Sequence, residues 1–426
     1  MFFYSTRDKN NHKTVSQAIL QGLAEDGGLF VPEYFPQIDW KSFDPNLSYP
    51  EFAARILKDY FAGDVLENQL PDICHGAFNF PLPVVKLEQN TYIMELIHGP
   101  TLSFKDFGAR FLAECMTRLS IERKTTIIVA TSGDTGSAVA GAFYQKPNVE
   151  VVVMFPKGQI SKRHEQQITC WGDNILAVAV RGTFDDCQKI VKQSFGDEWW
   201  TNRAHLSSAN SINIARLLPQ LTYYAYTSWQ FFLSHGKKAG YVIPTGNVGN
   251  STACYWAKAM GFPIREIVLA TNANRVISDY LENGEFNPLP SIPTIANAMD
   301  VGNPSNFERL RHLYSNFDDF VRNVKSYSVN DDIIRQTIQE VKRDFDYIVC
   351  PHTATGYYAR KQLDKDLPWI IAATAAPCKF ETVIEPLLAI TLPVAPQLAQ
   401  LLNREVQMVE VSADINEVAN ALATRQ

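Results

Sequence analysis

Short apolar segments alternate with helical patterns through most of the chain after Pro83. The apolar segments have the length of β-strands, are flanked by turn residues, and lie at 127–130, 149–155, 241–243, 267–270, 347–349 and 369–372. Parallel strands need a crossover between them, which is usually a helix, and their sheets are buried on both faces. The alternation therefore predicts an α/β fold in which parallel sheets are covered by helices.

The first part of the chain, up to about residue 90, has a different pattern. It consists of predicted helical pieces joined by Pro-rich connections, and the first helix is expected at 15–20. At roughly 150 residues per domain, the chain of 426 residues favours two or three domains. We predict a mostly helical N-terminal region at 1–90, a smaller α/β domain at 91–235 and a larger one at 236–426, to which part of 91–120 could also belong.

Two strand–loop–helix units contain a pair of glycines three residues apart. They are TTIIVATSGDTGSAVAGAF (125–143) and GYVIPTGNVGNSTACYWAKAM (240–260). Glycine lets the backbone approach a ligand closely, and the amides at the start of a helix attract an anion. Ordinary turns of an α/β domain have the same appearance, so each loop alone is weak support for an anion site. Neither loop is G-x-G-x-x-G and no G-x-x-x-x-G-K-[ST] segment occurs, which argues against dinucleotide and P-loop sites.

The segment HGPTLSFKDFG (98–108) places Lys105 between Phe104 and Asp106. A lysine beside an aromatic ring and out of water loses part of its preference for the charged form and becomes a nucleophile or base. Most lysines are instead solvated surface groups, and the local sequence alone does not separate these alternatives.

Composition and charge exclude several classes of partner. The chain has 39 basic and 45 acidic residues, for a net charge of −6, and this balance indicates neither nucleic acid nor an anionic membrane. The polar N-terminus and the absence of a long apolar run predict no signal peptide and no membrane span. The seven cysteines are scattered and form no C-x-x-C pair, which favours reduced thiols in a cytoplasmic protein. The segment 350–352 (Cys-Pro-His) has no second ligand cluster beside it, so we expect no metal.

The segment around Lys105 resembles the Schiff-base lysine motif of threonine synthases, which are tryptophan-synthase-β-like (fold-type II) pyridoxal-phosphate enzymes. The resemblance extends along the chain, in order, through AEDGGLFVPE (24–33), ATSGDTGSAVAGAF (130–143), SSANSINIARLLPQ (207–220), PTGNVGN (244–250), CPHTATGYYA (350–359) and ATAAPCKFE (373–381). It is to the shorter bacterial and fungal branch of the family. It implies two α/β domains with the cofactor, pyridoxal 5'-phosphate, in the cleft between them.

The resemblance also implies a role for particular residues. Lys105 would bind the cofactor and move protons, Thr374 would meet the pyridine nitrogen, and Asp134 would neighbour the ring hydroxyl. The cofactor phosphate would lie on Gly246, Asn247, Val248, Gly249 and Asn250. The carboxylate end of the substrate would lie on the loop with Thr131, Ser132 and Thr135, beside Asp134. The substrate phosphate would be bound by Asn210, Ser211 and Arg216, although without the resemblance a structural salt bridge is the better explanation of a buried arginine such as Arg216.

The implied reaction converts O-phospho-L-homoserine and water to L-threonine and phosphate by γ-elimination and β-addition of water. The alternatives are a related serine or threonine dehydratase, which needs no phosphate-binding segment, and a relative that binds without catalysis. A monomer or small homo-oligomer is expected. The chain departs from the pattern of the family at Ala376, where many relatives have histidine, at Cys378, and at Lys162, Arg163 and His164, and these departures concern the fit of the substrate.

Overall fold

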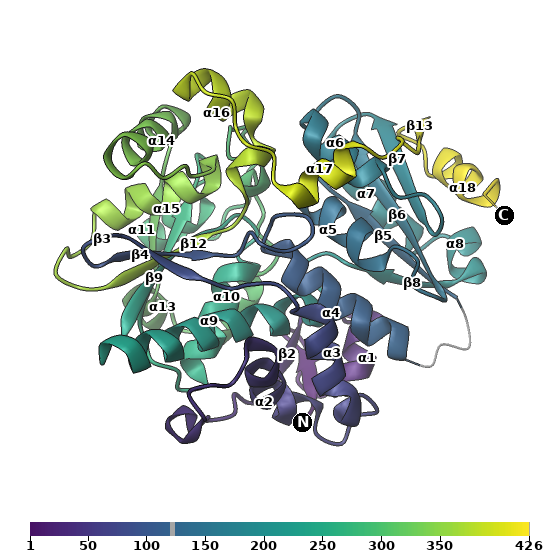
Figure 1. Ribbon diagram of the computed structural model, residues 1–426. Coiled ribbons are helices and arrows are strands. Elements are labelled where there is room, and N and C mark those ends of the chain that lie inside the picture. Colours follow the sequence, from purple (N-terminus) through teal and green to yellow (C-terminus); the bar gives the residue numbers. More distant parts are fainter. Residues whose placement is uncertain (120–123, 426) are drawn as a thin grey trace.

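Two largely parallel sheets lie side by side in the computed structural model, which describes residues 1–119 and 124–425 (Figure 1). The larger sheet has the order β11-β10-β9-β12-β4-β3, and only the pair β3–β4 is antiparallel. The smaller sheet, β13-β7-β6-β5-β8, is parallel throughout. The prediction of parallel sheets covered by helices is confirmed.

The strands of the larger sheet are β3 (Val84–Glu88), β4 (Thr91–Glu95), β9 (Ala239–Pro244), β10 (Ile264–Thr271), β11 (Lys325–Ser328) and β12 (Trp369–Ala373). Those of the smaller sheet are β5 (Thr125–Ala130), β6 (Val149–Pro156), β7 (Ile175–Arg181), β8 (His205–Ser208) and β13 (Met408–Ser412). The helices after residue 100 are α4 (Lys105–Arg118), α5 (Asp134–Phe143), α6 (Lys162–Thr169), α7 (Phe184–Ser194), α8 (Glu198–Arg203), α9 (Ile214–His235), α10 (Gly249–Ala259), α11 (Val276–Asn283), α12 (Phe307–Leu313), α13 (Phe317–Asn323), α14 (Asp331–Phe345), α15 (Pro351–Lys361), α16 (Glu381–Leu388), α17 (Pro396–Leu402) and α18 (Ile415–Ala423).

Both sheets are buried on both faces. Successive side chains of a strand point to opposite sides, so neighbouring residues pack into different cores. In β9, Tyr241 packs into the core shared with α9 and α10, whereas Val242 packs into the core shared with α14 and α15. In β6, Val151 faces the core that contains α5, and Val152 faces the core that contains α7 and α18. This double burial explains why the strands read as continuous apolar runs.

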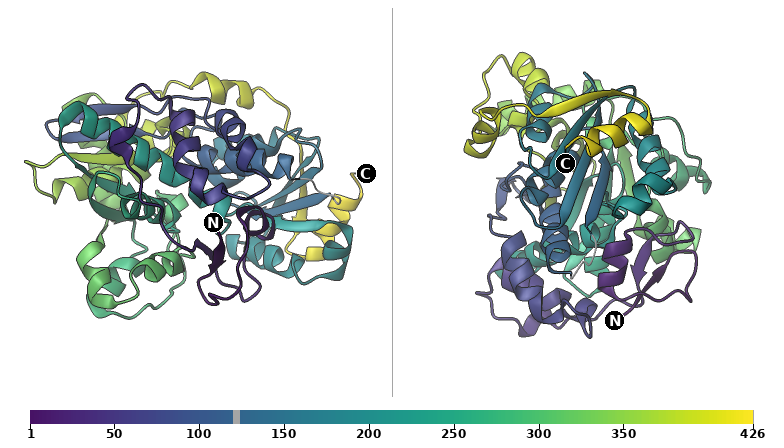
Figure 2. Two further views of the ribbon diagram at one scale, coloured as in Figure 1. Left: turned by 90° about the horizontal axis from the view of Figure 1, so that it is seen from below. Right: turned by 90° about the vertical axis from the view of Figure 1, so that its right-hand side faces the viewer.

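The N-terminal region packs below both sheets as they are seen in Figure 1, and it faces the viewer in the left panel of Figure 2. It contains α1 (Val15–Gln21), α2 (Tyr49–Phe61) and α3 (Leu70–Ala77), together with the short antiparallel pair β1 (Phe3–Ser5) and β2 (Phe30–Pro32). The predicted helix at 15–20 is α1, which begins with a capping box between Thr14 and Gln17. Helix α2 packs against α9, where Phe52 stacks on Trp229.

The predicted strand at 347–349 is wrong. These residues connect α14 to α15, and Val349 is buried against the larger sheet without pairing in it. The Tyr347 hydroxyl donates to Glu95 Oε1 at 2.7 Å. β12 pairs with β9 on one side and with β4 on the other, so the segment cannot pair with β12 and is covered by packing instead.

The predicted domain boundaries do not follow the sheets. β4, in the part of 91–120 that the prediction allowed to the larger domain, pairs with β12 of the larger sheet. β13, near the end of 236–426, pairs with β7 of the smaller sheet, and α17 leads to it across the top of Figure 1. β3 lies within the predicted helical region 1–90. The chain therefore crosses between the two sheets more than once.

Candidate active site

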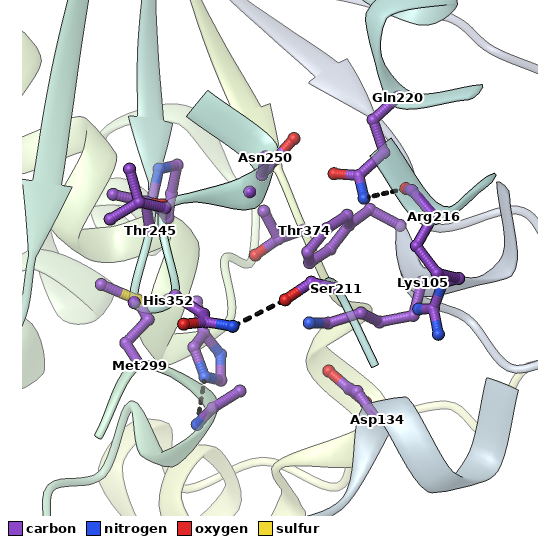
Figure 3. Close-up of a pocket in the computed structure, with 17 residues that line it drawn as sticks. Lys105, Asp134, Ser211, Arg216, Gln220, Thr245, Asn250, Met299, His352 and Thr374 are labelled. Carbon is purple, nitrogen blue, oxygen red and sulfur yellow. Dashed lines mark hydrogen bonds between the residues drawn. The ribbon is translucent and has the colours of Figure 1, made fainter. Parts of the chain in front are cut away.

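A pocket lies where loops at the carboxyl ends of β5, β9 and β12 meet α4 and α9 (Figure 3). Ligand sites of open α/β sheets are usually found outside these strand ends. The pocket is lined by Phe104, Lys105, Asp134, Ser211, Arg216, Gln220, Pro244, Thr245, Gly246, Asn247, Val248, Gly249, Asn250, Ala298, Met299, His352 and Thr374.

Lys105 is the first residue of α4 and projects into this pocket (Figure 3). Its Nζ lies 4.7 Å from the centre of the Phe104 ring, and no carboxylate of the described residues lies within ion-pair distance. Burial, together with the nearby charge of Arg216, lowers the pKa of the Lys105 ammonium to about 8. About one tenth of this side chain is therefore an uncharged amine at pH 7, and the uncharged form is the one that acts as a nucleophile or base.

The loop before Lys105 is held by Asp106. Its carboxylate accepts hydrogen bonds from the Thr101 amide at 2.9 Å and from the Thr101 hydroxyl at 2.6 Å. A side chain at Gly99 would collide with this carboxylate, because a Cβ there would lie 2.4 Å from Asp106 Oδ2. Leu102 has a φ of 60°, a left-handed conformation that is rare for leucine. The strained loop, held by these hydrogen bonds, fixes the start of α4 and therefore the position of Lys105.

The loop between β9 and α10 forms a cradle for an anion. None of the backbone amides of residues 246–250 donates a hydrogen bond to an acceptor in the described part of the chain. Val248 adopts a φ of 63°, which is a costly conformation for a β-branched residue. A Cβ at Gly246 would lie 2.6 Å from Met299 Cα. Unused amides at the start of a helix are a ready site for a phosphate group.

Asn250 adds a side-chain donor to this cradle. Its Oδ1 accepts hydrogen bonds from the hydroxyls of Tyr223 at 2.5 Å and Tyr224 at 2.8 Å. The Asn250 Nδ2 is buried and has no partner among the described residues, although the side chain lines the pocket. A buried amide without a partner is uncommon, and a bound anion would satisfy it.

Arg216 is almost completely buried on α9, with an exposed fraction of 1%. Its guanidinium donates to the Ala209 carbonyl, its Nε has no partner, and no carboxylate of the described chain lies within 4.0 Å. Burial lowers the pKa of Arg216 to about 10. The structural salt bridge considered from the sequence is therefore not formed. Gln220, one turn further along α9, lines the same pocket and donates to the Arg216 carbonyl at 2.5 Å (Figure 3).

Ser211 connects the Arg216 segment to the anion cradle. Its hydroxyl accepts hydrogen bonds from Asn247 Nδ2 at 2.6 Å and from Asn306 Nδ2 at 3.1 Å. Arg309 is fully buried and donates to the carbonyls of Ser211 at 3.1 Å and Phe30 at 3.0 Å. Arg309 thereby ties the N-terminal region to the wall of the pocket.

The loop after β5 ends at Asp134, the first residue of α5. The Thr131 hydroxyl accepts from the amides of Gly133 at 3.0 Å and Gly136 at 2.8 Å, so its role in the structure is to shape the loop. The Asp134 carboxylate accepts from His164 Nε2 at 3.0 Å and forms an ion pair with Lys379. Burial alone would raise the pKa of Asp134, but Lys379 and His164 hold it well below its ordinary value.

Two further side chains complete the floor of the pocket. The Thr374 hydroxyl, directly after β12, has no hydrogen-bond partner among the described residues and is free to meet a ligand. His352 Nε2 accepts from the Ala298 amide at 3.1 Å (Figure 3), and burial lowers the pKa of its imidazole to about 4. His352 is therefore neutral, with its proton on Nδ1.

The structure brings most of the expected site residues together but not all. The pocket is lined by the expected Lys105, Asp134, Ser211, Arg216, Gly246, Asn247, Val248, Gly249, Asn250 and Thr374. Thr131, Ser132 and Asn210 lie in adjacent loops and Thr135 lies in the first turn of α5, and none of them lines it. Sequence reasoning missed Gln220, His352 and Lys379 as site residues, although all three lie within segments that carry the family resemblance.

The residues that depart from the pattern of the family lie beside the pocket. Arg163 donates to the Cys378 carbonyl and lies 3.5 Å from a carboxylate oxygen of Glu381. Its charge is thus used within the fold and is not presented to a phosphate. Ala376 is buried, and its amide donates to the Leu102 carbonyl at 2.9 Å.

Family profiles match almost the whole chain. The profile of the pyridoxal-phosphate dependent enzyme family matches residues 79–368. The profile of the threonine synthase N terminus matches residues 2–78, and that of the threonine synthase C-terminal part matches residues 353–422.

Individual threonine synthases are similar over nearly their full length. The protein of Escherichia coli (strain K12) is 38% identical over 403 residues, which cover 94% of each chain. That of Schizosaccharomyces pombe (strain 972) is 31% identical, covering 90% of this chain and 88% of the other.

Solved structures extend the similarity to three dimensions. The crystal structure of threonine synthase from Escherichia coli superimposes with a TM-score of 0.93 at 36% identity and covers 100% of both chains. The pyridoxal-phosphate-bound threonine synthase from Brucella melitensis gives 0.92 at 30% identity and covers 100% of this chain and 99% of the other. The chain therefore belongs to the threonine synthase family of pyridoxal-phosphate-dependent enzymes.

Proposed function

We propose that this protein converts O-phospho-L-homoserine and water to L-threonine and phosphate. The observation that supports the proposal most strongly is the buried Arg216, which has no carboxylate partner among the described residues and lines the same pocket as Lys105. A buried charge without a partner is expensive, so the site is built for an anionic group that arrives with the ligand. A planar guanidinium matches a phosphate through two parallel hydrogen bonds.

The residues present fit pyridoxal phosphate. The amides of residues 246–250 and the unpartnered Asn250 Nδ2 would hold its phosphate, and the Thr374 hydroxyl would meet its pyridine nitrogen. Asp134 would lie beside the ring hydroxyl. Lys105 would provide the amine that binds the cofactor. When bound, the cofactor supplies an electron sink for negative charge at carbons of the amino-acid substrate.

Lys105 is the proposed acid and base of the reaction. Its pKa, lowered to about 8, allows Lys105 to remove a proton from Cα of the substrate and to return it later. General acid–base catalysis works best with a pKa near the working pH. A neutral hydroxyl at Thr374 would not keep the pyridine nitrogen protonated as a carboxylate would, which favours a less electrophilic ring.

The two ends of the substrate have separate proposed sites. The loop with Thr131, Ser132 and Thr135 would receive the carboxylate at the start of α5. Ser211, Asn210 and Arg216 would bind the phosphate that leaves from the γ-carbon. Holding both ends aligns the reacting bonds and stabilises charge on the leaving group.

Arg216 also separates this function from the alternatives. A serine or threonine dehydratase acts on a substrate without phosphate and has no need of a buried, unpaired arginine at this position. A relative that binds without catalysis has no need of a lysine whose pKa is lowered by burial.

We further propose a small molecule as the partner of the site and a monomer or small homo-oligomer as the assembly. We also propose a cytoplasmic location, which would keep the seven buried thiols reduced. Within the described residues, no helix is both long and apolar enough to cross a bilayer.

The test is steady-state kinetics of Arg216→Ala with O-phosphohomoserine. We expect kcat/KM to fall by at least about 100-fold, with both KM and kcat affected, because the arginine binds the ground state and orients the leaving group. Arg216→Lys keeps the positive charge but cannot donate two parallel hydrogen bonds to a phosphate, so its kcat/KM should lie between those of Arg216→Ala and the parent. Cofactor absorbance should survive in both variants. Near-normal kinetics in a folded, cofactor-loaded Arg216→Ala protein would contradict the phosphate role and favour a dehydratase.

A further inference from the structure

Lys379 and Asp134 form an ion pair that is buried beside the pocket. The exposed fraction of the Lys379 side chain is 0% and that of Asp134 is 5%. Lys379 belongs to a short 3-10 turn, Pro377–Lys379, that follows β12 of the larger sheet, whereas Asp134 begins α5 on the smaller sheet. The ion pair therefore joins the two sheets at the edge of the pocket.

Lys379 is fixed by a second contact on the side of the catalytic lysine. Its Nζ donates to the Thr101 carbonyl at 2.7 Å. The amide and hydroxyl of Thr101 donate to Asp106, the neighbour of Lys105. One ammonium group thus touches both the loop that positions Lys105 and the carboxylate at the start of α5.

Asp134 presents an electrostatic problem for an amino-acid substrate. The amides of Ser132, Asp134 and Thr135 have no acceptor in the described part of the chain, so they are free to bind a carboxylate. The negative charge of Asp134 at the same place opposes such binding, because like charges repel strongly out of water. His164 contributes one hydrogen bond to Asp134, at 3.0 Å. Lys379 contributes a full positive charge.

We propose that Lys379 is a positioning residue that neutralises Asp134 and thereby lets the loop 131–135 accept the carboxylate of the substrate. The inference rests on the proposed function, since it assigns how that site tolerates an amino acid. Loss of Lys379 should weaken ligands that have a carboxylate and spare ligands that lack one. Loss of the Asp134 charge in the same protein should reverse the effect.

The experiment compares two ligands of the holoenzyme by the change each causes in cofactor absorbance. L-2-aminobutyrate has an amine and a carboxylate, and 1-aminopropane is the same molecule without the carboxylate. In Lys379→Met we expect the Kd for aminobutyrate to rise at least tenfold and that for aminopropane to change less than threefold. In Lys379→Met/Asp134→Asn the Kd for aminobutyrate should return to within threefold of the parent. Lys361→Met, which removes a partly exposed ion pair with Glu340, is the matched control and should change neither Kd.

Two results would overturn the inference. One is an equal loss for both ligands in Lys379→Met, and the other is a double variant that binds aminobutyrate no better than Lys379→Met. If Lys379→Met does not yield a folded holoenzyme, judged by its thermal unfolding midpoint, Lys379→Gln takes its place, because it removes the charge and keeps a donor for the Thr101 carbonyl. The same selective loss of aminobutyrate binding is expected, and an equal loss for both ligands would refute the proposal. These constants need no turnover, so they stay meaningful even if the parent fails to make threonine and the proposed function is wrong.

Discussion

Lys105 shows how one partly buried side chain acquires its chemistry from its surroundings. Burial and the charge of Arg216 act in the same direction on the Lys105 ammonium and lower its pKa to about 8. The nearby charge of Asp134 acts in the opposite direction and offsets them only in part. The sequence segment identifies the lysine, and its lowered pKa follows from residues that lie far from it along the chain.

A pH dependence of cofactor loading follows from this value. A pKa of about 8 leaves roughly one tenth of the amine uncharged at pH 7 and about half at pH 8. The rate at which the apoprotein takes up pyridoxal phosphate should therefore rise about fivefold from pH 7 to 8 and less than about twofold from pH 8 to 9. Borohydride reduction and peptide mapping should then place the pyridoxyl group on Lys105. A rate that still rises tenfold per pH unit through pH 9, or a label on another lysine, would contradict the assignment.

Thr374→Val tests a second polar contact. The Thr374 hydroxyl has no partner among the described residues, so its loss should leave the unfolding midpoint unchanged. An unmet partner on the ligand costs about 1–3 kcal/mol, which corresponds to a fall in kcat/KM of about five- to 150-fold. Cofactor absorbance and turnover are the measurements. Thr337→Val, at a buried threonine on α14 whose hydroxyl donates to Ile333, is the control that should leave both unchanged. Parent-like values in Thr374→Val would place this hydroxyl outside the site.

At the scale of elements, the loop from β9 to α10 concentrates the requirements of the cofactor site. Gly246 lies against the backbone of Met299, and Val248 has a strained φ, in a loop whose amides have no acceptor among the described residues. Such strain is retained where it serves binding.

Gly246→Ala should separate binding from folding. The new Cβ would lie 2.6 Å from Met299 Cα, so the loop or the pocket wall must shift. We expect the affinity for pyridoxal phosphate to fall at least tenfold, measured by titration of the apoprotein. Gly196→Ala is a matched control, because its nearest neighbour would be 3.8 Å away, and its affinity should equal that of the parent. Equal affinities of the two variants for pyridoxal phosphate would show that cofactor binding does not depend on the close contact between Gly246 and the Met299 backbone.

The sequence predicts most of the long strands that are buried on both faces and misses the partly exposed edge strands. The long central strands β5, β6, β9 and β10 appear as apolar runs because both of their faces are covered. The edge strands β3, β11 and β13 are partly exposed and give no such run. The segment 347–349 is apolar for a different reason, since it packs on a sheet without joining it. β7 is an exception, because its apolar run is buried on both faces and is still missing from the predicted strands.

The site residues also divide into those that the sequence reveals and those that only the fold reveals. Lys105, Arg216 and residues 246–250 lie in segments that carry the family resemblance, and that resemblance indicates their roles where the local pattern alone does not. Lys379 could not be found from local sequence because its partner Asp134 is 245 residues away. His352 likewise depends on the Ala298 amide, which only the fold brings within 3.1 Å.

At the scale of the whole molecule, the site is assembled from both sheets. The smaller sheet contributes Asp134, the larger sheet contributes Thr374 and the anion cradle, and the helices α4 and α9 contribute Lys105 and Arg216. Each sheet alone holds only part of the pocket. The crossing of the chain at β4 and β13 interlocks them, which local sequence patterns do not reveal.

The central claim is tested most directly by incubating the purified, cofactor-loaded protein with O-phospho-L-homoserine and measuring both products. The account predicts that inorganic phosphate and L-threonine appear in equal amounts, and that Lys105→Ala forms neither. Release of a 2-oxo acid from L-serine or L-threonine, without threonine formation from O-phosphohomoserine, would contradict the account and identify a dehydratase.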